Sequence, residues 1–203
     1  MRIGAVIVAW LVIVAAPAWA TVPAAPDAAV PPAVVPPAAG DTGQKSADLD
    51  QLFAELQAAP TLAAGKQIEL QIIAAWLESG DQPTDEIMAQ AIIAMNSGDY
   101  VAALGYLDTI VSTHPDYVEG WNKRATLYYM MNDYKDSLAD IARTLALEPR
   151  HFGALAGLGM IRMSEGDKVG ALDAFKRAYA VDPALDNIKQ VIEEIETGGG
   201  QGI

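Results

Sequence analysis

The sequence predicts an all-α solenoid of three helix-turn-helix repeats, and two observations lead to this prediction. A proline and an aspartate each return three times at a spacing of 34 residues, and small residues and leucines return in the same register between them. Such a period is typical of solenoids, whose units bury their apolar faces against one another. The positions in register are Pro115, Pro149 and Pro183; Asp99, Asp133 and Asp167; Ala91, Ala125 and Gly159; Ala103, Ser137 and Ala171; Leu104, Leu138 and Leu172.

One repeat is predicted to form two antiparallel amphipathic helices joined by a turn at Asn132 and Asp133. A left-handed residue and a helix N-cap are needed at such a turn, and these two residue types supply them. Ala125 and Ser137 are small because the two helix backbones cross closely there. Pro149 cannot continue a helix, so it helps to end the second one. The inward faces are expected to carry Trp121, Ala125 and Tyr128 on the first helix and Leu138, Ile141 and Leu145 on the second.

This pattern resembles the tetratricopeptide-repeat (TPR) family over about half of the chain. In the middle repeat the family's characteristic places are taken by Trp121, Ala125, Tyr128, Ser137, Ile141 and Pro149, with Arg124 where leucine is usual. The resemblance implies a TPR-type α-solenoid with repeats at residues 84–117, 118–151 and 152–185. The expected helix pairs are 85–97 with 100–113, 118–131 with 134–147, and 152–164 with 169–181.

Helical segments are also predicted on both sides of the repeats. Residues 47–83 read as a degenerate N-terminal helical pair, which lacks the small residues and the turn in register. We expect this pair to cover the exposed face of the first repeat, because a solenoid unit cannot bury its apolar face alone. Residues 186–197 have one apolar and one polar face, as a C-terminal cap helix should. Residues 198–203 are rich in glycine and are predicted to form a flexible tail.

The first 20 residues have the pattern of a signal peptide. One arginine precedes an uncharged apolar run, and Ala18-Trp19-Ala20 gives the small-x-small triplet that predicts cleavage after Ala20. Residues 21–46 are rich in alanine and proline and are predicted to be a disordered linker. We therefore expect a periplasmic protein with no membrane contact after signal cleavage. The alternative is an uncleaved N-terminal membrane anchor facing the periplasm, since the apolar run approaches a spanning length.

Composition excludes several classes of function. The chain has a net charge of −13 and no cysteine, which rules out disulfides, thiolate metal sites and cysteine nucleophiles, and makes nucleic acid a poor partner. The two histidines, His114 and His151, lie at repeat junctions without the spacing of a metal site. They are expected to form hydrogen bonds between repeats. The sequence thus predicts no enzyme, no catalytic or metal-binding residues and no cofactor.

Arg124 occupies an inward place where a charge needs a partner. The carboxylate of Asp140, on the second helix of the same repeat, is expected to lie within reach of this guanidinium. Buried charges are normally paired. We therefore predict an ion pair within the repeat. Trp121, in the same helix, is predicted to be a largely buried structural residue. Trp121, Arg124 and Asp140 are thus assigned structural roles.

The resemblance to the TPR family also implies a binding surface, because in that family the first helix of each pair lines a concave face. The predicted peptide-binding groove consists of Met88, Ile92, Met95, Asn122, Thr126, Tyr129, Met160 and Met163. Methionine is flexible and polarizable, and it recurs on surfaces that accept varied apolar partners. The alternative is that some of these methionines are covered by the N-terminal pair or by a neighbouring repeat.

The predicted function is that of a non-enzymatic protein–protein interaction module, a scaffold or adaptor of the bacterial cell envelope, binding a protein or peptide segment in this groove. Family members that hold a C-terminal carboxylate use a clamp of lysine and asparagine. Here the matching places hold Met88, Ile92, Gly153 and Gly157, so such a ligand is disfavoured. The alternative function is structural, through self-association, with the groove or an end helix buried against a second copy as a homo-oligomer.

Overall fold

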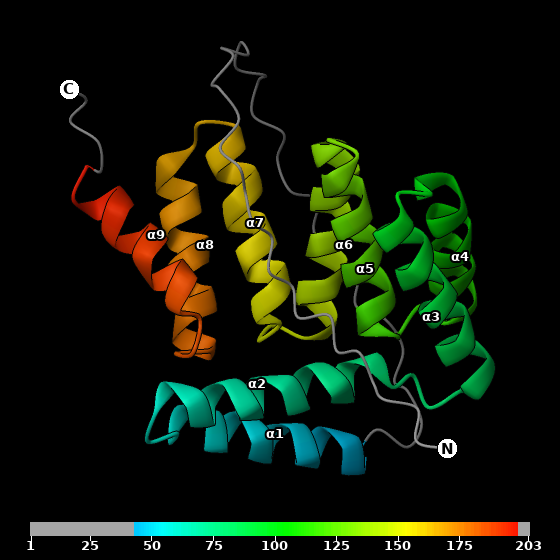
Figure 1. The fold of residues 1–203 in the computed structure, drawn as a ribbon, viewed down its shortest axis with the longest axis horizontal. Coiled ribbons are helices and arrows are strands. Elements are labelled where there is room, and N and C mark those ends of the chain that lie inside the picture. The colour runs from blue at the N-terminus through cyan, green and yellow to red at the C-terminus, as the bar shows by residue number, and fades with distance from the viewer. Residues whose placement is uncertain (1–42, 199–203) are drawn as a thin grey trace. The chain divides into compact units, whose positions relative to one another are not determined.

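The computed structural model describes residues 43–198, with side chains from residue 48, and nearly all of this range is helical. The predicted signal peptide, most of the linker and nearly all of the tail lie outside it. The helices are α1 (Gly43–Gln57), α2 (Leu62–Leu77), α3 (Gln82–Ser97), α4 (Tyr100–Thr113), α5 (Val118–Met130), α6 (Tyr134–Leu147), α7 (Phe152–Ser164), α8 (Lys168–Val181) and α9 (Asp186–Glu196). The all-α prediction and its three pairs are confirmed (Figure 1).

Three helix starts differ from the prediction, that of α8 by a single residue, since it begins at Lys168 instead of Val169. Helix α3 begins at Gln82 because the Asp81 carboxylate accepts the Thr84 N–H at 3.0 Å, and Pro83 fits the first turn, where a missing N–H costs nothing. Helix α1 begins at Gly43, inside the segment assigned to the linker.

The turn inside each pair is built in the same way in all three repeats. A residue in the left-handed conformation ends the first helix, and the next aspartate caps the second through its side chain. The left-handed residues are Gly98 (φ 78°), Asn132 (φ 62°) and Gly166 (φ 81°). The capping carboxylates of Asp99, Asp133 and Asp167 accept the N–H of Ala102, Asp136 and Gly170. The turn predicted at Asn132 and Asp133 is therefore confirmed, and it returns every 34 residues.

Small residues allow the two helices of a pair to approach. The Ser137 hydroxyl donates to the Ala125 carbonyl at 2.8 Å, and both residues are buried. A Cβ atom at Gly159 would overlap the ring of Phe175 on the facing helix. The small positions of the 34-residue pattern are therefore crossing points, as predicted.

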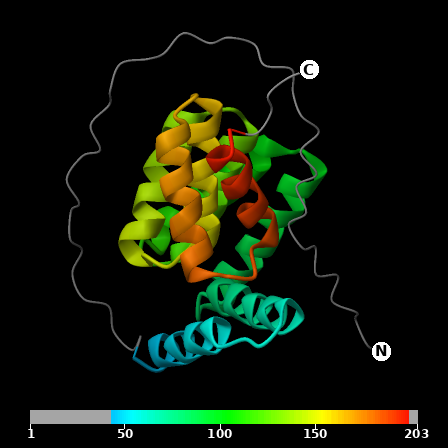
Figure 2. The same ribbon diagram turned by 90° about the vertical axis from the view of Figure 1, so that its left-hand side faces the viewer.

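The N-terminal pair lies in a different place from the one predicted. Instead of covering the outer side of the first repeat, α1 and α2 run crosswise under the loops that join successive repeats (Figures 1 and 2). Phe53, Ile72 and Trp76 of this pair form one apolar cluster with Phe152 at the start of α7 and Ala184 after α8. The prediction is wrong because the apolar sides of α1 and α2 pack against residues at the ends of the repeats, Phe152 and Ala184, and not against the outer side of the first repeat.

Polar contacts hold the N-terminal pair against the loops as well. The Gln57 amide donates to the carbonyls of Ala180 and Val181 at the end of α8, at 2.9 and 2.7 Å. The Tyr117 hydroxyl donates to the Leu77 carbonyl at 2.7 Å. These bonds satisfy helix-end carbonyls that would otherwise lack partners.

One buried carboxyl at this interface is less stable in its charged form than it would be in water. Asp182 is fully buried, and its Oδ1 accepts the Ala184 N–H, whereas its Oδ2 has no hydrogen-bond partner. Burial, together with the nearby charge of Glu69, raises the pKa of Asp182 to about 6 from 3.8, although the Ala184 bond and Lys66 lower it in part. Because the folded state holds this proton more tightly, Asp182 lowers stability as the pH rises from about 4 to about 6.

Helix α9 closes the C-terminal end of the repeats, as predicted. Ile188 and Ile192 are buried against Phe175 of α8, while charged residues lie on the outer side of the helix. Within the described range, no helix combines the length and apolar character needed to cross a bilayer.

Candidate functional site

The candidate site is the face formed by the first helices of the pairs, α3, α5 and α7. Ile92, Thr126 and Met160 occupy the same place of the repeat on these three helices, and all three are half-buried. Asn122, Tyr129 and Met163 are half-buried as well. Six of the eight predicted groove residues thus offer part of their surface to a ligand.

The remaining two, Met88 and Met95, belong to the core. They are 2% and 5% exposed and pack with Leu107 in the apolar cluster of the first repeat. Leu77 at the end of α2 and the Tyr117 ring pack against the same cluster, so the end of the N-terminal pair helps to enclose it. These two methionines fill core space and do not line an open groove in this structure.

The middle of the face is ordered by bonds within α5. The Thr126 hydroxyl donates to the Asn122 carbonyl at 2.9 Å, and the Asn122 amide donates to both carboxylate oxygens of Glu119 at 3.2 Å. Tyr129 packs against Tyr134, with ring centroids 5.6 Å apart. Burial and Tyr134 raise the pKa of Tyr129, while a hydrogen bond with Ser164 lowers it in part. The side chains here are fixed before any ligand binds.

The third repeat bounds the face at its C-terminal end. Met160 and Met163 pack against the cluster that joins α8 and α9, which accounts for their partial burial. Gly153 near the start of α7 is exposed, whereas a Cβ atom at Gly157 would meet Ile141 of α6, so Gly157 faces the preceding repeat. A polypeptide backbone could approach α7 closely at Gly153.

A buried charged cluster lies at the N-terminal end of α5. The Glu119 carboxylate lies 2.8 Å from the Lys123 ammonium and 3.0 Å from His151 Nε2, and all three residues are buried. His151 Nδ1 accepts the Ala154 N–H, which fixes the ring at the start of α7. Burial opposes the charge on Glu119, but Lys123 and His151 outweigh it and lower the pKa of Glu119 to about 2 from 4.5.

Trp76 covers this cluster from the side of the N-terminal pair. Its ring stacks on the His151 imidazole, with centroids 4.0 Å apart and planes inclined by 13°. The sequence predicted a role in inter-repeat hydrogen bonding for His151, and the bond that it accepts from the Ala154 N–H of the third repeat confirms it. Sequence reasoning missed the cluster, although a lysine stands at residue 123 where the other repeats have Ala89 and Gly157.

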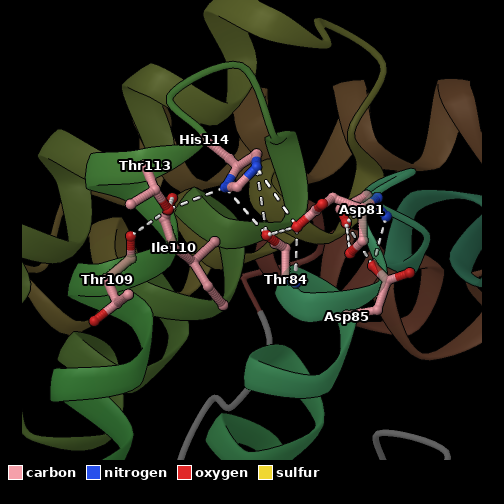
Figure 3. Close-up of polar contacts among 8 residues, drawn as sticks. Asp81, Thr84, Asp85, Thr109, Ile110, Thr113 and His114 are labelled. Carbon is pink, nitrogen blue, oxygen red and sulfur yellow. Dashed lines mark hydrogen bonds and ion pairs between the residues drawn. The ribbon is translucent and has the colours of Figure 1, made fainter.

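His114, the second histidine, joins the first repeat to the loop that follows it (Figure 3). Its ring nitrogens lie 3.1 and 3.4 Å from the Thr84 hydroxyl, which donates in turn to Asp81 at 2.8 Å. The Thr113 hydroxyl lies 3.0 Å from His114 Nδ1. All partners of this ring belong to helix ends and caps, so the geometry is that of a structural junction.

The predicted ion pair is confirmed and has a third member. Arg124 donates from Nε and Nη2 to the two carboxylate oxygens of Asp140, at 2.7 and 2.9 Å, and from Nη1 to Asp108 at 2.8 Å. Asp108 belongs to α4, so the guanidinium also links two repeats. Trp121 is half-buried rather than buried in the core. Its ring lies 5.0 Å from the Arg124 guanidinium carbon and 5.7 Å from that of Arg143, which are cation–π distances.

Comparison with known proteins gives the same family in sequence and in structure. A family model described as a tetratricopeptide repeat matches residues 122–186. A TPR repeat-containing protein of Rhizobium etli is 38% identical over 136 residues, which make up 67% of this chain and 67% of that protein.

Solved structures agree in fold. The first TPR of Spaghetti (RPAP3), bound to the HSP90 peptide SRMEEVD, superposes with a TM-score of 0.54 at 15% identity, over 58% of this chain and 93% of that one. A crystal structure of MamA superposes with a TM-score of 0.53 at 16% identity, over 81% of this chain and 86% of that one.

Proposed function

The chain belongs to the tetratricopeptide-repeat family, and from this premise we propose that it is a non-enzymatic module that binds a segment of another protein along α3, α5 and α7. The observation that carries the proposal is a row of uncharged, half-buried side chains in equivalent places of successive repeats. Solved TPR domains of the same fold hold peptides, among them the domain bound to SRMEEVD. The row consists of Ile92, Asn122, Thr126, Tyr129, Met160 and Met163.

The chemistry of this row favours an uncharged, partly apolar ligand. Lys123, which follows Asn122 in α5, is buried against Glu119, so its ammonium is not presented to a ligand carboxylate. Methionine, isoleucine and tyrosine offer apolar contact area, and the exposed Gly153 lets a peptide backbone lie close to α7. An acidic peptide such as SRMEEVD would find no cation among the six residues of the row.

Adding a charge to the middle of the row should abolish binding. Thr126→Glu places a carboxylate between Ile92 and Met160, where an apolar ligand would have to bury it. We expect peptides selected from a random 12-residue display library against the wild-type chain to lose at least about tenfold in affinity, or roughly 1.4 kcal/mol. Fluorescence anisotropy with the selected peptides measures this loss.

The control adds the same charge to the same repeat outside the row. Ala139→Glu lies on α6 at an exposed position, so it should leave the affinity unchanged. Equal binding by the wild type and both variants would move the ligand site away from the row.

The proposal extends to location, with the cell envelope as the place of action. The support is the uncharged apolar run and the Ala18-Trp19-Ala20 triplet, which fit an exported chain cleaved after Ala20. N-terminal sequencing of the chain isolated from bacterial periplasm should therefore begin at Thr21. Full-length chain in the membrane fraction would indicate the anchored alternative, and full-length chain in the cytosol would contradict export.

A further inference from the structure

No residue within 43–198 covers the outer side of the first repeat, although equivalent surfaces in the other two repeats are buried. Ile93 is 59% exposed, whereas its counterparts at the same place of the repeat, Leu127 and Ile161, are 0% exposed. Those two are covered because another repeat precedes them. We call this uncovered surface the N-terminal end face, and it consists of Pro83, Glu86, Ala89, Gln90, Ile93 and Tyr106, all of them exposed.

The repeat pattern shows that the end face is a stacking surface and not an ordinary polar exterior. Tyr106 on α4 corresponds to Asp140 and Ala174, and both of these are buried. Ala89 corresponds to Lys123, which is buried, and to Gly157, which is half-buried. Pro83, Ala89 and Gln90 also line a shallow open hollow in α3 together with Glu86 and Ile87. The N-terminal pair, which could have filled this place, is docked under the loops.

We propose that the N-terminal end face binds the same face of a second copy of this chain, forming a twofold symmetric dimer. Charge is the first argument. Glu86 is the single charged residue of the six, and Gln82 donates to it at 3.0 Å, in a chain with a net charge of −13. A contact between two copies at this face would therefore bury few charged groups.

The opposite end of the repeats does not fit this role. Helix α9 already covers α8 there, and its outer side carries Glu193 and Glu194, both exposed. A head-to-tail contact would leave an end face free on one copy and helix α9 free on the other, so it would not close. A head-to-head contact repeats one surface about a twofold axis and closes on itself.

The size of the face predicts a weak dimer. Helices α3 and α4 have 16 and 14 residues, so they are roughly 24 and 21 Å long. Two helices packed about 10 Å apart offer a footprint on the order of 500 Å², at the low end for specific association. We therefore expect association that depends on concentration rather than an obligate dimer.

The experiment is sedimentation velocity of the chain at concentrations from about 1 μM to 1 mM, a range that brackets weak interfaces. The wild type should shift from monomer to dimer across this range. Ile93→Asp should weaken dimerisation at least about tenfold, because a twofold contact contains residue 93 twice. A wild type that stays monomeric at every concentration would overturn the proposal.

Val101→Asp is the matched control. Val101 lies in the same repeat and is 85% exposed, but its counterpart Val169 is 82% exposed in the third repeat, so this position is not part of a stacking surface. The control should dimerise like the wild type. If both variants dimerise equally, the contact lies elsewhere, for instance in residues 1–42, and the proposal fails.

A second experiment, chemical crosslinking, detects the contact between two copies directly. The chain has no cysteine, so Gln90→Cys introduces a single thiol on the end face and Val101→Cys a single thiol outside it. With a short bis-maleimide reagent, the first variant should give a covalent dimer and the second should not. Equal crosslinking of the two variants would contradict the twofold contact.

Discussion

Glu119→Ala should destabilise the folded chain by about 3–5 kcal/mol, because it removes one partner of a buried charged group. The Lys123 ammonium would stay buried without this carboxylate, and His151 would lose the hydrogen bond from Nε2. The His151 ring also supports Trp76, so the loss should spread to the docking of the N-terminal pair. Urea unfolding at pH 7, followed by circular dichroism, measures the change.

The pKa of Glu119 also predicts how its contribution to the stability of the folded chain changes with pH. The folded pKa of Glu119 is about 2, below its ordinary value of 4.5, so the unfolded chain binds the proton more tightly. The stabilisation is therefore present above about pH 4.5 and is lost as the pH falls towards 2. It should be on the order of 3 kcal/mol in the wild type and missing from Glu119→Ala.

The exposed Glu86→Ala is the control for this pair of measurements. It removes a carboxylate from α3 that is bonded to Gln82, and it should change the stability by less than about 0.5 kcal/mol. A loss below about 1 kcal/mol for Glu119→Ala would mean that the cluster does not hold α5 and α7 together.

The repeats could be predicted from the sequence because their determinants are local and recur. A left-handed residue followed by aspartate needs no distant partner, so Asn132 and Asp133 indicate the turn by themselves. The crossing of two helices imposes a small residue at one spacing, which is why Ala125 and Ser137 were sufficient. Each of these features depends on residues within about one repeat.

The position of the N-terminal pair could not be predicted in this way. Its amphipathic pattern shows which side of each helix is apolar, but not which apolar surface will meet it. Phe152 and Ala184 receive the pair, and they are far from Trp76 in sequence. The missing small residues marked the pair as degenerate, but its sequence did not show which surface of the repeats it covers.

The residues of the groove were predicted only in part, because contacts with other elements also decide which side chains are buried. The place of a residue in the repeat gives the direction of its side chain, but burial also depends on what lies beyond it. Met88 and Met95 occupy groove places of the repeat, yet both are buried, and Leu77 and Tyr117 pack against their cluster. The Glu119 cluster was missed because it joins α5, α7 and α2, three segments whose contact no repeat pattern indicates.

Arg124→Ala should cost about 3–5 kcal/mol in the wild-type chain, because Asp140 would keep a buried carboxylate without its counter-ion. Bonds to Asp140 raise the pKa of Arg124, so the guanidinium stays charged. Burial raises the pKa of Asp140, and its bonds to Arg124 lower it in part, which shows that the carboxylate depends on this partner. Thermal and urea unfolding measure the cost.

A double-mutant cycle isolates the pair. In a chain that already carries Asp140→Ala, Arg124→Ala should cost less by about 1–3 kcal/mol, since no buried carboxylate remains to be left unpaired. Asp108 provides the internal control, because it binds the same guanidinium at 2.8 Å from an exposed position. The cycle with Asp108→Ala should give a coupling below about 1 kcal/mol, as surface ion pairs do. If the two cycles gave equal couplings, burial would not be what makes the Asp140 bond strong.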